Sequence, residues 1–249
     1  MLMKKAKGST QFNCFSPPVM LATMIIEASL AAYTIWRYKM TPLIRLATLT
    51  LVMLASFQLA EYFVCTGSVG HAITWSRIGF AAITLLPALG VHLMHRVAGK
   101  SIGKLVYTAY ASMTAFVVFF LAFPQVFSNY QCTGNYVIFH LTPLAGGLYW
   151  IYYMGWIFFA MYQGVRWAYQ LQVKGKLRQL KAVQGLIIGW LVFLVPTAIA
   201  NIVNPGTRSA IPSVMCGFAV LFALILTLYI LPKVAKVNRH LQQSRRHTA

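Results

Sequence analysis

The chain has 249 residues, 59% of them hydrophobic, and it carries 21 Lys and Arg against two acidic residues, for a formal net charge of +19. A nucleic-acid-binding protein gathers such charge on a water-facing groove, whereas these cations flank long apolar runs, so nucleic acid is excluded as the expected partner. Little sequence remains for a separate soluble domain, and we expect an all-α, polytopic integral membrane protein.

Seven apolar runs follow one another along the chain, each near the roughly 20 residues that a membrane-spanning helix needs. Prolines, glycines and charge clusters separate them. The predicted spans are Pro18–Trp36, Leu43–Cys65, Ile73–His95, Leu105–Phe123, Tyr136–Val165, Ala182–Ile202 and Ser209–Leu231. The sequence therefore predicts an extracytoplasmic tail over 1–17, a seven-helix domain over 18–232 and a basic cytoplasmic tail over 233–249.

The positive charges indicate how the chain is oriented. Sixteen of the 21 cations lie in the first, third and fifth connections and in the C-terminal tail, while Arg77, Arg208 and three lysines of the N-terminal tail lie toward the other face. Cytoplasmic loops collect Lys and Arg, so the C-terminus is predicted to be cytoplasmic. Seven crossings then place the N-terminus outside.

Both acidic residues lie inside predicted spans, where an ionisable side chain is costly unless it faces protein. Glu27 lies near mid-depth of the first span, and Glu61 lies about a turn and a half from the outer end of the second. Gln58 shares a helix face with Glu61 and the depth of Glu27, which predicts a Gln58–Glu27 hydrogen bond. Arg77 lies near the depth of Glu61, which predicts an Arg77–Glu61 ion pair.

These contacts have two interpretations. They are interhelical fasteners, each contributing on the order of 1 kcal/mol, or they belong to an outer-leaflet polar pocket that binds a ligand. The residues predicted to line that pocket are Glu27, Gln58, Glu61, Tyr62, Arg77, His140, Asn201 and Asn204.

The four cysteines all fall on the predicted outer half, at Cys14, Cys65, Cys132 and Cys216. An even number on the oxidising side permits two disulfides with three alternative pairings, and free thiols packed as small hydrophobic groups are the other interpretation. No Cys/His spacing indicates a zinc site. His92 and His95, three residues apart at the inner end of the third span, fit an interfacial position better than a metal site, so no metal is predicted.

Two short patterns resemble known membrane proteins. The run Trp75-Ser-Arg-Ile-Gly-Phe-Ala-Ala-Ile-Thr-Leu-Leu-Pro87-Ala-Leu-Gly-Val-His92 resembles the third helix of the seven-helix N-terminal sensor modules of bacterial histidine kinases. Asn-Cys14-Phe-Ser-Pro and Gln58-Leu-Ala-Glu61-Tyr resemble a group of uncharacterised bacterial membrane proteins. The resemblances cover about the first 95 residues and imply a stand-alone sensor of the bacterial inner (cytoplasmic) membrane, since no kinase domain follows the seventh span.

We therefore expect a non-catalytic, receptor-like protein that binds a small ligand or a membrane partner on its outer half and passes a helix shift inward. Its expected partners are the lipid bilayer, a separate signalling or membrane protein and, as an option, a second copy of the chain. The residues indicate no particular cofactor. A retinal protein is excluded because the last span, 209–231, contains no lysine for a Schiff base.

Two other classes of function stay open. The first is a membrane enzyme, or a redox or metal-handling protein, that would use Glu27, Glu61, Met20, Met24, His140 and the outer cysteines. The second is a transporter, which the odd number of spans and the lack of an internal repeat disfavour.

Overall fold

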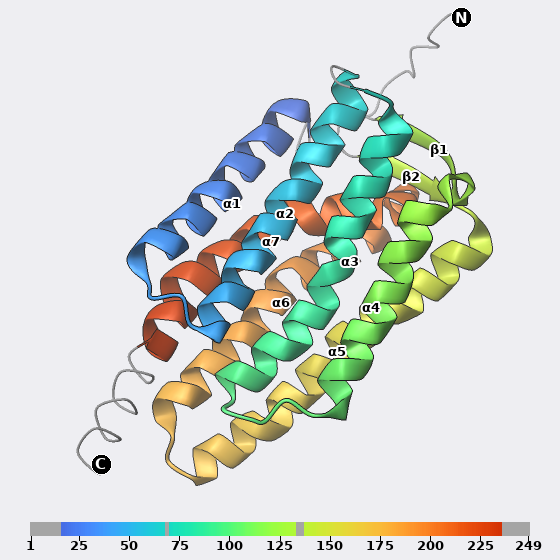
Figure 1. Ribbon diagram of the computed structural model, residues 1–249. Coiled ribbons are helices and arrows are strands. Elements are labelled where there is room, and N and C mark those ends of the chain that lie inside the picture. The colour runs from blue at the N-terminus through green and yellow to red at the C-terminus, as the bar shows by residue number, and fades with distance from the viewer. Residues whose placement is uncertain (1–15, 68–69, 133–136, 236–249) are drawn as a thin grey trace, which may run out of the picture.

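The computed structural model describes residues 16–67, 70–132 and 137–235 of the chain. Seven long helices run back and forth and pack side by side into one bundle (Figure 1). The elements are α1 (Pro17–Arg37), α2 (Pro42–Thr66), α3 (Ala72–Val97), α4 (Lys104–Ala122), β1 (Phe127–Cys132), β2 (Val137–Leu141), α5 (Pro143–Val173), α6 (Leu177–Val203) and α7 (Ile211–Leu224).

The seven predicted apolar helices are confirmed in the described part of the chain. Each is long and apolar enough to cross a membrane, α7 together with its continuation to Ala235. That continuation includes a π-helical segment, Ile225–Ile230. Residues 1–15 and 236–249, which hold most of the predicted tails, lie outside the described residues.

The connection between α4 and α5 contains a β-hairpin that the sequence did not predict. Residues 127–132 and 137–141 form an antiparallel two-stranded hairpin in which Cys132 pairs with Val137 and Phe127 with Leu141. The predicted fifth span began at Tyr136, whereas α5 begins at Pro143. The run from Val137 to Leu141 is β-branched and aromatic and favours a strand, and a proline at the first helical position starts the helix.

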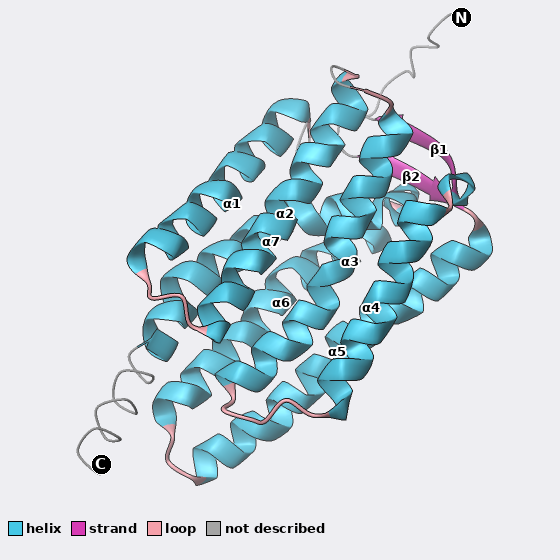
Figure 2. Ribbon diagram, viewed as in Figure 1, coloured by secondary structure: helices cyan, strands magenta, loops and turns pink. Residues whose placement is uncertain are grey.

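The two ends of the bundle differ in structure and in charge. At the end that we call the hairpin end lie β1, β2 and the α2–α3 and α6–α7 connections (Figure 2). At the opposite end, which we call the basic end, lie the α1–α2, α3–α4 and α5–α6 connections. The predicted cation-rich connections of the described chain all lie at the basic end.

An aromatic core holds the hairpin against the helices. The Phe80 ring of α3 is 1% exposed, and its centroid lies 5.2 Å from that of Phe127 in β1 and 5.3 Å from that of Phe139 in β2. Phe120 of α4 and Tyr149 of α5 complete this cluster, at 5.3 Å and 5.7 Å from Phe80. Such ring pairs add to the stabilisation from burial, so the hairpin is a packed part of the bundle.

Candidate functional site

The carboxyl groups of Glu27 on α1 and Glu61 on α2 are buried together in the bundle, where α1, α2 and α7 contact one another. Glu27 is 0% exposed, Glu61 is 1% exposed, and the two groups are close enough for negative charges on them to repel. Gln58, one turn before Glu61, is 2% exposed. The structure thus buries in this part of the bundle three of the side chains that the sequence assigned to a polar pocket.

These side chains leave several polar atoms without partners. Both carboxyl oxygens of Glu27, Oε1 of Glu61 and Nε2 of Gln58 are buried and have no hydrogen-bond partner among the described residues. The predicted Gln58–Glu27 hydrogen bond is therefore wrong, because equal depth in neighbouring helices does not aim an amide at a carboxyl group. A buried polar group without a partner lowers stability by about 1–3 kcal/mol, so the cluster is not explained as a fastener.

The predicted Arg77–Glu61 ion pair is also wrong. The Arg77 guanidinium lies against α4, where Nε donates to the carbonyl oxygen of Phe120 at 3.3 Å and Nη2 donates to the carbonyl oxygen of Leu121. These are among the last carbonyls of α4, which lack partners inside the helix and form the negative end of its dipole. The Arg77 guanidinium therefore has hydrogen-bond acceptors without a carboxylate partner.

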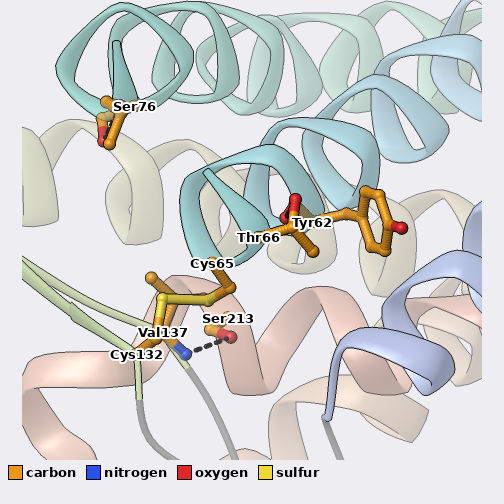
Figure 3. Close-up of a disulfide and its surroundings, with 8 residues drawn as sticks. Tyr62, Cys65, Thr66, Ser76, Cys132, Val137 and Ser213 are labelled. Carbon is orange, nitrogen blue, oxygen red and sulfur yellow. Dashed lines mark hydrogen bonds between the residues drawn. A yellow bond between two sulfur atoms is a disulfide. The ribbon is translucent and has the colours of Figure 1, made fainter. Parts of the chain in front are cut away.

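Helix α7 brings two small polar side chains to the carboxyl cluster. The Ser213 hydroxyl is within interaction range of Glu61, and its oxygen accepts the backbone N–H of Val137 in β2 at 3.2 Å (Figure 3). Cys216, one turn further along α7, is 3% exposed and within electrostatic range of both Glu27 and Glu61. Ser213 is therefore bonded to the hairpin and lies within interaction range of Glu61.

The cysteines are paired differently from the expected two disulfides. Cys65, at the end of α2, is bonded to Cys132 of β1, with 5.6 Å between their Cα atoms (Figure 3). Cys216 is a free, buried thiol, so the expected second disulfide is not formed by this residue. Cys14 lies outside the described residues.

A cavity of about 280 Å³ lies beside the carboxyl cluster, between α3, β2, α5 and α7. Most of its wall is apolar or aromatic, and His140 and Cys216 are among its few polar residues. Its lining includes Phe80, Phe139, His140, Gly146, Tyr149, Trp150, Tyr153, Met215 and Cys216. Trp150 is 52% exposed, so the cavity reaches the surface of the bundle. A mostly apolar wall with a few polar groups is typical of small-molecule sites.

Of the eight predicted pocket residues, His140 lines this cavity and the other seven are not part of its wall. Asn201 Oδ1 accepts a hydrogen bond from the Thr207 hydroxyl at 2.6 Å, and Asn204 Oδ1 accepts the Gly206 N–H at 3.1 Å. Both asparagines thus stabilise the α6–α7 turn. Tyr62 is half-buried and packs against Phe63, and its ring points away from the disulfide (Figure 3).

No metal centre is formed by the side chains that the structure describes. No three His, Cys, Asp or Glu residues in those ranges are placed to share an ion. His92 Nδ1 lies 2.9 Å from the Tyr110 hydroxyl, whereas His95 Nδ1 lies 2.8 Å from the Val91 carbonyl oxygen. The two imidazoles are therefore engaged separately. Met20 is buried in the aromatic core of the hairpin end.

Comparisons with known proteins leave the site to be interpreted from its own residues, because no family model, curated protein or solved structure matches the chain. Sequence reasoning missed Ser213 as a partner of Glu61 and the aromatic residues as a cavity wall. One signal in the sequence could have indicated Ser213. It lies three residues before Cys216, so the two side chains share a face of α7.

Proposed function

We propose that the chain is a non-catalytic, receptor-like multi-pass membrane protein that binds a small, mainly apolar molecule in the cavity at its hairpin end. One observation carries this proposal: the mostly apolar cavity is lined by Cys216, whose thiol is within electrostatic range of Glu27, and neither carboxyl oxygen of Glu27 has a partner among the described residues. A molecule bound there would contact β2, α5 and α7 together. It would therefore act on the elements that meet at Ser213.

The expected transmission runs from the cavity to α7. Phe139 and His140 of β2 and Met215 and Cys216 of α7 line the cavity, and Ser213 joins the same two elements through its bond to Val137. Displacing either element would change the contacts that Ser213 makes with Val137 and Glu61. Since α7 runs on to the basic end, a shift of this helix would reach a separate signalling protein there.

The charge distribution supports the orientation in this proposal. The cation-rich connections gather at the basic end, so we infer that this end is cytoplasmic and the hairpin end is extracytoplasmic. The disulfide Cys65–Cys132 supports the same orientation, because disulfides persist in oxidising compartments. A bacterial inner membrane is the location that the sequence resemblance implies.

A pair of glycine substitutions tests the cavity. Gly146 lines it, and a Cβ atom there would meet Leu141 Cβ at an ordinary 3.7 Å. Gly146→Leu should fill the cavity and abolish recovery of a co-purified small molecule by mass spectrometry. It should also protect Cys216 from methyl methanethiosulfonate. Gly147 is exposed, and a Cβ atom there would have nothing within 4 Å, so Gly147→Leu is the matched control and should behave like the wild type. Equal recovery and equal labelling in both variants would contradict the proposal.

A second candidate function rests on the carboxyl pair itself. Buried ionisable residues within spans mark proton and ion pathways in transporters and membrane enzymes, and both oxygens of Glu27 lack partners among the described residues. A proton-linked activity would be lost in Glu27→Gln and Glu61→Gln while Gly146→Leu left it intact. The receptor proposal expects ligand recovery to depend on Gly146 instead.

A further inference from the structure

A second hollow lies at the basic end, far from the cavity described above. It has a volume of about 120 Å³, well above the space that one water molecule needs. Three chain segments form it: the turn after α3, the end of α5 and the start of α6. Its polar lining is Lys100, Gln170, Lys174, Lys176 and Gln179. All of these side chains can donate hydrogen bonds.

Lys100 is held at this hollow by three contacts. Its backbone N–H donates to the His95 carbonyl oxygen at 2.8 Å, which closes the end of α3. Its Nζ donates to Gln170 Oε1 at 2.9 Å and lies 5.7 Å from the centroid of the Trp167 ring. An ammonium group carries three donors, so Lys100 keeps donors for a ligand after bonding to Gln170.

Two glycines bring the remaining donors together. Gly175 has φ +66°, a left-handed conformation that turns the chain between α5 and α6 and places Lys174 and Lys176 on either side of it. Gly99 has the same φ, and a Cβ atom there would lie 3.0 Å from Gln179 Nε2. The missing side chain at Gly99 therefore leaves room for the Gln179 amide beside Lys100.

The protein has no acidic side chain with which to neutralise these lysines. Its two acids, Glu27 and Glu61, are both buried near α7, in the cluster described above. Three lysines line this hollow, and their positive charges repel one another unless an anion from outside binds between them. Basic pockets between helix ends are also where anionic headgroups bind on the cytoplasmic side of membrane proteins.

We propose that this hollow binds a phosphate group, with Lys100, Lys174 and Lys176 as cationic donors and Gln179 as a neutral donor. Both an anionic phospholipid headgroup and a free phosphate compound carry that group. The site is separate from the proposed receptor cavity, so its existence does not depend on that function.

The test uses the full-length protein in neutral detergent and follows thermal unfolding during titration with phosphatidylglycerol, phosphatidylcholine or inorganic phosphate. The pocket variant is Lys100→Gln/Lys174→Gln/Lys176→Gln. The matched control is Arg37→Gln/Lys39→Gln/Arg45→Gln, which removes the same charge from the α1–α2 connection at the same end of the bundle.

We expect phosphatidylglycerol to stabilise the wild type, and its half-saturating concentration to rise at least about tenfold in the pocket variant, as loss of charge-assisted hydrogen bonds implies. The control should change less than about twofold. Stabilisation by inorganic phosphate with the same dependence on the pocket lysines would assign the site to a free phosphate compound. Equal weakening in both triple variants, or stabilisation by none of the three additives, would overturn the proposal.

Discussion

Glu27 has an environment that stability alone does not explain. It is fully buried, and neither carboxyl oxygen has a hydrogen-bond partner among the described residues. Replacing such a group with an apolar side chain of similar size removes an unmet desolvation cost. We expect Glu27→Leu to raise the free energy of unfolding by about 1–3 kcal/mol, measured by thermal or denaturant unfolding in detergent.

Thr34 provides the contrast on the same helix. It is equally buried, and its hydroxyl donates to the Leu30 carbonyl oxygen at 2.8 Å. Thr34→Val removes a satisfied group and should leave stability unchanged or lower it by up to about 1 kcal/mol. If Glu27→Leu were the more destabilising of the two variants, Glu27 would be a stabilising contact between helices and not an unsatisfied buried group.

Ser213 lies between the hairpin and the carboxyl cluster. Replacing it should therefore affect the contacts of both Val137 and Glu61. Ser213→Ala leaves the buried Val137 N–H without an acceptor and should lower the free energy of unfolding by about 1–2 kcal/mol. Ser76 is similarly buried, and among the described residues its hydroxyl bonds only to the Ala72 carbonyl oxygen of its own helix. Ser76→Ala should therefore be nearly neutral, and equal losses in unfolding experiments on the two variants would contradict the assigned contact.

For single residues, the sequence predicted burial better than it predicted hydrogen-bond and ion-pair partners. Burial of Glu27, Gln58 and Glu61 followed from the length of the apolar runs and the shared helix face. The partners of Arg77 and Gln58 were wrong because depth along a helix leaves its rotation undetermined. Arg77 faces the carbonyl end of α4, a partner that no search for complementary charges would find.

The hairpin is the element whose attachment can be tested most directly. The disulfide joins Cys132 of β1 to Cys65 of α2 across 67 positions of sequence. Disulfides typically contribute about 2–4 kcal/mol by restricting the unfolded chain, and helices that stay in lipid when unfolded are already restricted. We expect Cys65→Ser/Cys132→Ser to lower the free energy of unfolding by about 2 kcal/mol.

The control for this prediction lies in the single variants. Cys65→Ser and Cys132→Ser each break the same bond, so each should lower the unfolding temperature about as much as the double variant. Cys216 is a free thiol, so adding a reductant should affect the wild type and spare the double variant. Additive losses in the two single variants would mean that the thiols act separately.

The sequence did not predict this hairpin because its second strand is apolar and runs directly into α5. Residues 136–141 extend the hydropathy of the fifth span, and hydropathy does not distinguish an apolar strand from a helix. Pro143 was the missed boundary signal. Once the strand is separated, its inward residues Val137 and Phe139 alternate with Ile138 and His140, as a half-buried strand requires.

The whole molecule is predicted to lie across a membrane with its basic end in the cytoplasm. Gln125, beside the hairpin, and Gln172, near the end of α5, are both exposed and lie at opposite ends of the bundle. In a Cys14→Ser background, Gln125→Cys should react with an impermeant maleimide in intact spheroplasts. Gln172→Cys should react only after permeabilisation, and the reverse pattern would invert the proposed orientation.

The helical architecture was predictable because hydrocarbon imposes length and composition on each span, and the seven predicted spans correspond to seven helices. Pairwise contacts across the bundle carry no such signature in one sequence. The cavity depends on how α3, α5 and α7 diverge around Phe80 and Tyr149, and that is a property of packing. For the same reason, the hollow around Lys100 became visible only when the ends of three helices were placed together.

The Cys65–Cys132 bond also constrains the order in which the protein can be assembled. Two complete helices, α3 and α4, are synthesised between the two thiols. In the proposed orientation, the two thiols therefore cannot meet until α3 and α4 have both crossed the membrane and β1 has emerged at the hairpin end. If the proposed topology holds, formation of this bond would mark the correct insertion of α3 and α4, and a chain arrested before that point would keep a free thiol at the end of α2.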